Sequence, residues 1–468
     1  MAVGLPNLIP YMFYFWNKDV ESNYLGISKE HSIEYAKQQI QRLIYSLNQP
    51  FLRSGIQSAF TNTSIFDHPY FEALFGGSSF PDGTFMIDYE EEIIDFQKIF
   101  LQQLSEIRSR NMMTFPVNSI SLLRQNGKFV DEEFAKYAIK HNMKWSDSNL
   151  FVDSSVNSLS NCCRLKSNIK DLGYFNSLGG TALKVGSVKV STINLARIAL
   201  ESNNEEEYLQ KLEDITILDI KALDAVRHII KRNVDKGLLK NFSYGIVDFE
   251  HLYNTIGIIG VFETMKKFGY TTKDEFGNTY YTDDAYKFGE KIFKTIHRVK
   301  DEMQEKFGYM INCEAIPGES AAAKLMQKDK FLYPNADIYD LPLYGNQFIP
   351  LGIQATLQER IKIAAAFDSY CNGGSIAHIN IDAPFDSFDK AWKMVNYIAD
   401  TGLTYFAFNT KINACEDNHA FYGNTCPVCG KPIETQYTRI AGFYTPINTW
   451  SKERKQEYKM RRWENINK

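Results

Sequence analysis

Residues 415–450 read CEDNHAFYGNTCPVCGKPIETQYTRIAGFYTPINTW. Within this stretch, Cys426 and Cys429 flank Pro-Val and are followed by glycine, a spacing that lets both thiolates bind one tetrahedral ion. Cys415 and His419 lie upstream, four residues apart, and can supply two further ligands. Three cysteines and one histidine leave no open position for water, so we predict a structural zinc site. The alternative is a surface loop of reduced cysteines.

Gly442 follows this cysteine motif in the short loop Arg-Ile-Ala-Gly-Phe-Tyr, which spans residues 439–444. A radical on a backbone Cα is stabilised by delocalisation into the two flanking peptide groups, and this delocalisation requires a planar centre. Glycine suits such a centre because it carries no side chain to crowd the planar arrangement. A lone glycine in a loop is otherwise explained by an ordinary turn.

The stretch RIAGFYTPINTWSKERKQEYKMRRW, residues 439–463, resembles the C-terminal glycyl-radical loop of anaerobic (class III) ribonucleotide reductases. A zinc knuckle shortly before the loop is a feature of the same family. The resemblance places the radical at Gly442. It also implies an α/β fold, a ten-stranded barrel of the glycyl radical and ribonucleotide reductase type, here incomplete at its N-terminus.

The composition is that of a large globular protein. The chain has 468 residues, of which 44% are hydrophobic and 14% aromatic, and its net charge is −4 with a pI of about 6.1. This slightly acidic net charge does not predict a surface that binds nucleic acid. The seven cysteines suit a reducing cytoplasm, and no apolar run approaches the length of a membrane span. We therefore expect a cytoplasmic protein with no membrane partner.

Strand-like and helical stretches alternate along the chain, and this order predicts an α/β fold with a largely parallel sheet. Hydrophobic periodicity predicts helices over 28–47, 90–108, 131–142, 205–238, 251–268, 283–307, 358–372 and 388–399. Strands are expected over 57–65, 114–123, 187–195, 308–316 and 404–410. A glycine pair, Gly373 and Gly374, is predicted to cap the 358–372 helix. The basic stretch 452–462 is interpreted as a solvated helix face.

We divide the chain into three parts. The resemblance implies that residues 1–411 form the catalytic barrel, with a polar finger loop at about 149–186. Residues 412–434 form the zinc-binding knuckle, and residues 435–468 form the glycyl radical loop and the C-terminal tail.

Cys162 and Cys163 lie in the middle of the polar loop. A disulfide between adjacent cysteines would be strained, and from the residues alone a catalytic and a structural role both remain open. The resemblance adds an assignment, because the family holds a cysteine followed by arginine on such a loop. It implies that Cys163 carries the thiyl radical, with Cys162 as the second candidate.

Two further features bear on the site. The segment GSVKVSTINLARIA, residues 186–199, is similar to a family segment whose asparagine hydrogen-bonds the substrate sugar, and this likeness implies that role for Asn194. Formate-using members resemble Met-x-Cys-x-Ser around the finger-loop cysteine, whereas this chain has Asn161 and Leu165 at the flanking positions. The reductant therefore stays open between formate and a redoxin.

A Pro-Gly-Glu-Ser motif follows the predicted strand at 308–316 and opens a helix. Free backbone N–H groups and the helix dipole would hold substrate phosphates there, and the resemblance implies the same use. The candidate substrate-binding residues are Gly318, Glu319, Ser320 and Ala321. The alternative is an ordinary helix start. Cys313 and Cys371 are predicted to be core thiols.

The resemblance implies anaerobic reduction of ribonucleoside triphosphates to 2′-deoxyribonucleoside triphosphates by a glycyl/thiyl radical mechanism, for DNA precursor synthesis. It also implies a radical-SAM iron–sulfur activating enzyme as partner, ATP and other nucleotide binding, and a homodimer. Complete members begin well upstream, so we expect either that a separate chain supplies an opening segment or that the chain is a truncated or divergent form. The alternatives are a pyruvate formate-lyase-like glycyl radical enzyme and a catalytically silent zinc-containing subunit.

Overall fold

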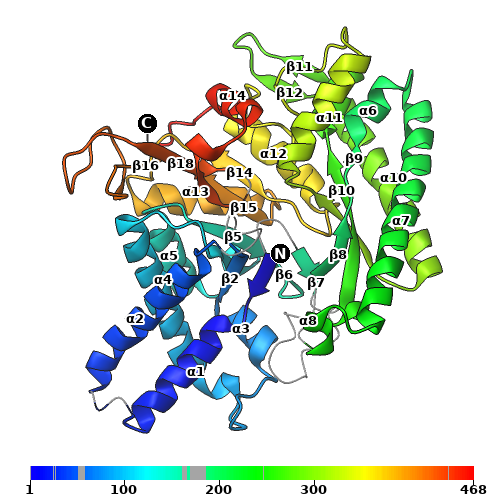
Figure 1. The fold of residues 1–468 in the computed structure, drawn as a ribbon. Coiled ribbons are helices and arrows are strands. Elements are labelled where there is room, and N and C mark those ends of the chain that lie inside the picture. Colours follow the sequence, from blue (N-terminus) through cyan, green and yellow to red (C-terminus); the bar gives the residue numbers. More distant parts are fainter. Residues whose placement is uncertain are drawn as a thin grey trace.

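The computed structural model describes residues 2–24, 26, 28–50, 58–160, 166–168, 186–245, 247–440 and 442–467. Two groups of strands build its centre, and helices cover them on the outside (Figure 1). Among the described residues, no helix is both long and apolar enough to cross a membrane.

The larger sheet has the strand order β1–β2–β3–β5–β15–β14. The first four strands are parallel, β15 runs antiparallel to β5, and β14 is parallel to β15. The strands are β1 (Ala2–Leu5), β2 (Phe60–Phe66), β3 (Val117–Gln125), β5 (Ser148–Asp153), β14 (Ala377–Asn380) and β15 (Tyr405–Asn409), and the short β4 (Lys128–Phe129) pairs with β3.

The second sheet has the order β13–β10–β8, with β9 also pairing with β10, and all its pairs are parallel. Its strands are β8 (Gly186–Val190), β9 (Ile193–Asn194), β10 (Leu252–Ile259) and β13 (Ile311–Ala315). A parallel bridge between Glu314 and Gly374, just before β14, joins the two sheets. The Gly374 carbonyl accepts from Ala315 N at 3.0 Å, so one wall of strands runs from β1 to β8.

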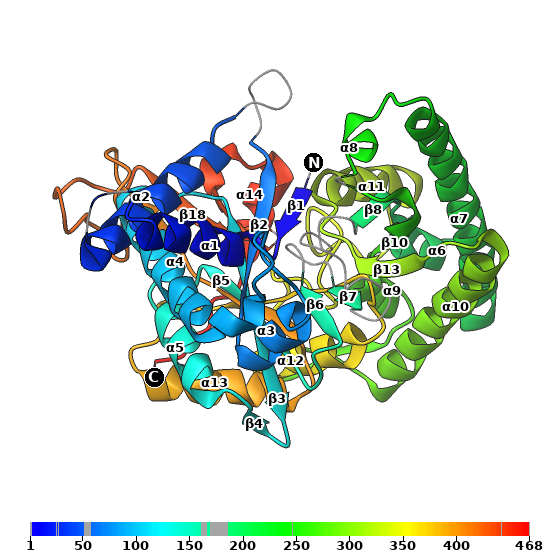
Figure 2. The same cartoon turned by 90° about the horizontal axis from the view of Figure 1, so that it is seen from below.

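Helices surround this wall, as the view from below makes clear (Figure 2). Beside the larger sheet lie α1 (Leu8–Glu21), α2 (Lys29–Leu47), α3 (His68–Phe75), α4 (Glu90–Arg110), α5 (Glu132–Asn142) and α13 (Phe388–Asp400). Beside the second sheet lie α6 (Leu195–Leu200), α7 (Glu205–Asp235), α8 (Lys240–Ser243), α9 (Val261–Lys267), α10 (Asp283–Phe307) and α11 (Glu319–Leu332). Helix α12 (Leu357–Asp368) lies between the two groups and contacts both β14 and α10. Two antiparallel pairs of short strands stand outside these sheets, β6 (Ser158–Ser160) with β7 (Lys166–Asn168) and β11 (Thr271–Lys273) with β12 (Thr279–Tyr281).

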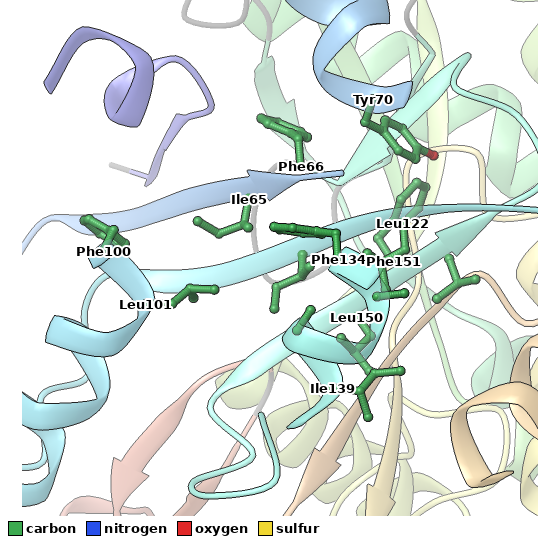
Figure 3. Close-up of a cluster of buried hydrophobic side chains, with 14 of the residues drawn as sticks. Ile65, Phe66, Tyr70, Phe100, Leu101, Leu122, Phe134, Ile139, Leu150 and Phe151 are labelled. Carbon is green, nitrogen blue, oxygen red and sulfur yellow. The ribbon is translucent and has the colours of Figure 1, made fainter. Parts of the chain in front are cut away.

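The two faces of the larger sheet differ in chemistry. Apolar side chains such as Ile65, Leu122 and Leu150 form the hydrophobic core with α4 and α5 (Figure 3). Successive residues of a strand point to opposite faces. Asn62, Ser119 and Asn149 are all fully buried, so this wall carries a layer of polar side chains inside the protein.

Most predicted elements are confirmed, including the helices that the structure has at 29–47, 90–110, 132–142 and 283–307. The helix predicted over 251–268 is wrong. Residues 252–259 form the buried strand β10, because the run Thr255 to Ile259 is rich in β-branched side chains, and the short helix α9 starts only after Gly260, which has a φ of 85°.

Three other predictions need correction. The helix predicted over 358–372 ends at Asp368, and Gly373 and Gly374 pair with β13 instead of capping it. The polar loop does not begin at residue 149, because residues 148–153 form strand β5. The basic stretch forms helix α14 (Lys452–Met460) as expected, but it is not simply a solvated face, because Arg454 and Glu457 are buried.

Glu263 on α9 provides a pH test of the second sheet's packing. It is 2% exposed, accepts a hydrogen bond from Gly345 N at 2.9 Å, and burial raises its pKa from 4.5 to about 7. Because the pKa is higher in the folded state, Glu263 contributes most to stability when it is protonated in both states, below the unfolded pKa of 4.5. That contribution is lost as pH rises through the folded-state pKa of about 7.

We expect the free energy of unfolding of the wild type, relative to Glu263→Gln, to fall by about 3 kcal/mol between pH 4.5 and pH 8. Glutamine keeps the acceptor for Gly345 N and cannot ionise. Urea unfolding of both proteins at each pH measures the difference. A difference that does not change with pH would contradict the assignment.

Candidate active site around Gly442

The four predicted metal ligands come together. Cys415, His419, Cys426 and Cys429 place their ligand atoms within 4.8 Å of one another. His419 Nδ1 lies 3.6 Å from Cys415 Sγ and 3.7 Å from Cys426 Sγ, and the Sγ atoms of Cys415 and Cys429 are 3.6 Å apart. Ligand atoms around a tetrahedral zinc are about 3.5 to 3.8 Å apart, so the residues fit that ion.

The metal ligands and the glycine loop belong to one sheet. Its order is β17–β16–β18–β19, with β16 (Ile412–Ala414), β17 (Ala420–Phe421), β18 (Thr435–Arg439) and β19 (Tyr444–Pro446). Cys415 directly follows β16 and His419 directly precedes β17. The predicted boundary at residue 434 therefore separates two parts of a single sheet.

Gly442 lies in the turn between β18 and β19 and is buried. The antiparallel pairing of Arg439 with Tyr444 closes this turn, and Ile440 N donates to Phe443 O at 3.3 Å. The Phe443 ring packs against Phe60 of β2, with ring centroids 4.9 Å apart. The turn is therefore held against the strands of the larger sheet.

The carbonyl oxygen of Gly442 accepts two hydrogen bonds. One comes from Arg439 Nη1 at 2.6 Å and the other from Asn149 Nδ2, on β5, at 3.3 Å. Arg439 and Asn149 also bond each other, from Nη1 to Oδ1 at 2.7 Å. Both side chains are 0% exposed, so the backbone at the candidate radical position is fixed by buried polar groups.

Charged residues support Arg439 from two sides. Arg108 and Asp147 form a buried ion pair at 2.5 Å. Burial would raise the pKa of Asp147, but the charges of Arg108 and His141 outweigh it and hold that pKa below its ordinary value. Burial also lowers the pKa of Arg439 below its ordinary value.

The second support comes from the C-terminal helix. Arg461, just after α14, donates from Nη1 to the backbone oxygen of Arg439 at 2.8 Å. Glu457 holds Arg461 in place through bonds of 2.9 Å to Nε and to Nη2. Burial would raise the pKa of Glu457, but Arg461 and Arg454 lower it below its ordinary value.

The polar face beside this turn has unused hydrogen-bonding capacity. Asn149 and Ser119 both bond the hydroxyl of Tyr405, at 3.1 and 3.0 Å, and Asn62 donates to Ser119 at 3.1 Å. Counting only the described residues, the buried Oδ1 atom of Asn62 has no hydrogen-bond partner, and neither does Ser121 Oγ on the same face. Such atoms favour a polar occupant.

The predicted phosphate-binding turn lies close to the same region. Gly318 is the N-cap of α11, and Ser320 and Ala321 follow in its first turn with Glu319. A groove of about 560 Å³ is lined by Ser320 and Lys324 of α11 together with Ile440 and Phe443. The structure thus brings the start of α11 and the glycine turn to one groove.

Asn194 has a clear structural function. Its Oδ1 caps α6 by accepting from Arg197 N at 3.1 Å, and its Nδ2 donates to Asp329 of α11 at 2.8 Å. Asp329 also accepts from Tyr344 at 2.6 Å. The contact with substrate sugar stays a prediction. Cys162 and Cys163 lie outside the described residues, in the stretch 161–165 between β6 and β7.

The sequence matches one family along nearly its whole length. Residues 2–463 fit the family described as anaerobic ribonucleoside-triphosphate reductase. This chain belongs to that family.

Solved reductase structures agree in fold. One, described as an anaerobic ribonucleotide reductase, is 38% identical, with a TM-score of 0.91 over 99% of this chain and 73% of that chain. Another, from Thermotoga maritima in complex with dATP and CTP, is 39% identical, with a TM-score of 0.87 over 98% of this chain and 74% of that chain. These matches confirm the predicted barrel of the glycyl radical type.

A curated relative is more distant. The anaerobic ribonucleoside-triphosphate reductase of Escherichia coli K12 is 22% identical over 311 residues, which are 58% of this chain and 41% of that protein. The aligned part is therefore less than half the length of that reductase.

The sequence analysis does not identify two residues of the candidate site. Arg439 stands in the quoted glycine loop, but the loop pattern assigns it no role. Asn149 is expected in a polar loop but lies on β5. One sequence signal could have pointed to a polar interior. Asparagine and serine occur inside otherwise strand-like stretches such as Phe60–Phe66 and Val117–Gln125, and polar residues that are buried in strands need polar partners.

Proposed function

We propose that this chain carries the catalytic centre of an anaerobic ribonucleoside-triphosphate reductase, which converts ribonucleoside triphosphates to 2′-deoxyribonucleoside triphosphates. The observation that carries the proposal is the burial of Gly442, with its carbonyl bonded to Arg439 and Asn149 beside a polar inner face. A stored radical needs a closed site that excludes water and oxygen. Family membership supplies the reaction class.

In this proposal Gly442 stores the unpaired electron. A thiol of Cys163, or of Cys162, gives its hydrogen atom to the Gly442 radical, and the resulting thiyl takes the 3′ hydrogen atom from the ribose. The 2′ hydroxyl then takes up a proton and leaves as water. The reductant, formate or a redoxin, supplies two electrons, C2′ gains a hydrogen with a second proton, and the cysteine thiol returns a hydrogen atom to C3′. The unpartnered Asn62 Oδ1 and Ser121 Oγ are available to a sugar on the polar face.

The triphosphate would bind at the start of α11. Backbone N–H groups of Glu319, Ser320 and Ala321 are free of helical partners in the first turn of a helix, and Gly318 permits close approach. Lys324 in the adjoining groove adds a positive charge. The complex of the Thermotoga maritima enzyme with dATP and CTP supports nucleotide binding in this family.

The group of three cysteines and one histidine would hold zinc. Zinc supplies no step of the reaction in a closed site, because all four positions are taken by protein ligands. The ligands Cys415 and His419 lie at the ends of β16 and β17, so the ion would stabilise the sheet that carries Gly442.

The proposed partners are a radical-SAM iron–sulfur activating enzyme and a second copy of the chain in a homodimer. The family match favours the reductase over a pyruvate formate-lyase-like enzyme. A catalytically silent zinc-containing subunit remains the alternative that the experiment must separate.

The test is activation under argon with a radical-SAM activase, S-adenosylmethionine and a reductant, followed by EPR spectroscopy. We expect a glycyl doublet and then formation of deoxyribonucleotides from ribonucleoside triphosphates, with formate and a dithiol compared as reductants. Exposure to air should cleave the chain at Gly442. A doublet without nucleotide turnover would contradict the reductase. The lack of any doublet, even with a relative's N-terminal segment added, would support the silent subunit.

A further inference from the structure

The two hydrogen bonds on the Gly442 carbonyl have a chemical consequence beyond holding the turn in place. We propose that Arg439 and Asn149 stabilise the glycyl radical itself, by binding the negative charge that delocalisation places on this oxygen. This inference rests on the proposed function, because it requires that Gly442 carries the radical. Both donors are 0% exposed, so water does not weaken their effect.

The radical forms when the Cα–H bond of Gly442 breaks homolytically. The hydrogen atom goes to an alkyl radical supplied by the radical-SAM activase, and one electron stays on Cα. The amide nitrogen then donates electron density and the carbonyl group accepts it. One contributing structure therefore has the unpaired electron on nitrogen and a negative charge on the carbonyl oxygen.

Donors aimed at this oxygen stabilise the radical more than they stabilise the parent glycine. The reason is that the carbonyl oxygen carries more negative charge in the radical than in the parent glycine. The same logic applies to oxyanion holes, where preorganised donors bind charge that develops during a reaction. The contact from Arg439 Nη1 is short, at 2.6 Å, as charge-assisted hydrogen bonds are. The structure therefore provides a charged donor and a neutral one.

Both donors are preorganised. Arg439 is fixed by Nη2 donating to Ser146 O at 2.7 Å and Nε donating to Phe408 O at 3.2 Å. The Asn149 amide has one orientation that satisfies its neighbours, because its oxygen must accept from Arg439 Nη1. Its nitrogen then faces the Gly442 carbonyl and the Tyr405 hydroxyl.

The positive charge of Arg439 remains available to the Gly442 oxygen. The guanidinium donates to four acceptors, and all four are neutral. They are the backbone oxygens of Gly442, Phe408 and Ser146 and the amide oxygen of Asn149. The nearby carboxylate of Asp147 accepts its hydrogen bond from Arg108, at 2.5 Å, and acts on Arg439 through its charge, which the opposite charge of Arg108 counteracts.

The sharpest test is Asn149→Asp in the full chain. The carboxylate is nearly isosteric and still accepts from Arg439, but it replaces the amide donor by a negative charge facing the Gly442 oxygen. After activation under argon, we expect the spin count per chain to fall about ten-fold and the radical to decay faster. Arg439→Lys keeps the charge and should lose less.

A spectroscopic readout separates this effect from a merely structural one. In protein labelled with ¹⁵N-glycine, the nitrogen hyperfine coupling of the residual radical should be smaller in Asn149→Asp than in the wild type, because less spin moves to nitrogen. The matched control is Asn142→Asp, a buried asparagine whose amide bonds Ser148 O at 3.2 Å and whose oxygen accepts from Ser148 N at 3.0 Å. It should keep the wild-type coupling.

Wild-type spin count, decay and nitrogen coupling in a folded, zinc-containing Asn149→Asp protein would overturn the inference and leave the proposed function intact. Loss of the doublet in the wild type would instead remove the proposed function and this inference with it. If Asn149→Asp does not fold, Asn149→Ser, which only removes the amide donor, carries the same expectation with a smaller loss. An unchanged coupling there overturns the inference equally.

Discussion

Gly442→Ala is expected to give no glycyl doublet after activation and no nucleotide turnover. The added methyl group replaces one of the two hydrogen atoms on Cα and crowds the planar arrangement that delocalisation requires. Gly442 is also buried beside Phe443, whose ring is packed on Phe60, so the turn has little freedom to adjust. EPR spin counting and product analysis measure the two losses.

The control for this variant is its fold. Zinc content and the thermal midpoint should stay close to those of the wild type, because the four metal ligands lie in the segments between β16, β17 and β18 and not in the β18–β19 turn. A contaminating enzyme could give turnover on the order of one hundredth of the wild-type rate. Turnover of Gly442→Ala above that level would refute Gly442 as the radical position.

Cys426→Ser is expected to remove the metal and, with it, the radical. A serine hydroxyl is a poor substitute for a thiolate, and binding of a structural zinc is coupled to folding by about 10 kcal/mol or more. We therefore expect zinc to fall from about one to less than about 0.1 per chain. The glycyl signal should fall in parallel, because β18 and β19 belong to the same sheet as β16 and β17, whose ends adjoin Cys415 and His419.

The matched control is Cys371→Ala. Cys371 is 1% exposed and lies in the hydrophobic core of the second sheet, away from the four ligands. That variant should keep its zinc and its radical while losing some thermal stability. Full zinc content in Cys426→Ser, measured by plasma mass spectrometry, would contradict the ligand assignment.

Local patterns in the sequence predicted most of the fold and the metal ligands. Periodicity works for helices such as α10 because one face of the helix packs on the core. It failed for β10, since a strand buried on both faces has an apolar run without alternation. The Cys-x-x-Cys spacing predicted a four-ligand group because the chemistry of zinc dictates that spacing.

The polar contacts of the site could not be predicted in the same way. Asn149 and Arg439 are 290 positions apart in the chain and meet only because β18 comes to lie against β5. Arg461 and Glu457 looked like a solvated helix face, since a run of charged residues usually is one. Their burial depends on tertiary packing that no local pattern contains.

The burial of Gly442 also has a consequence for how the chain can be switched on. Gly442 is buried, and its carbonyl oxygen is bonded to Asn149 and Arg439. Under the proposed function, an activase would therefore have to meet a different conformation, in which the β18–β19 turn exposes Gly442. The rate at which that conformation forms would limit the rate of activation. Its lifetime would determine how long the radical is exposed to dioxygen.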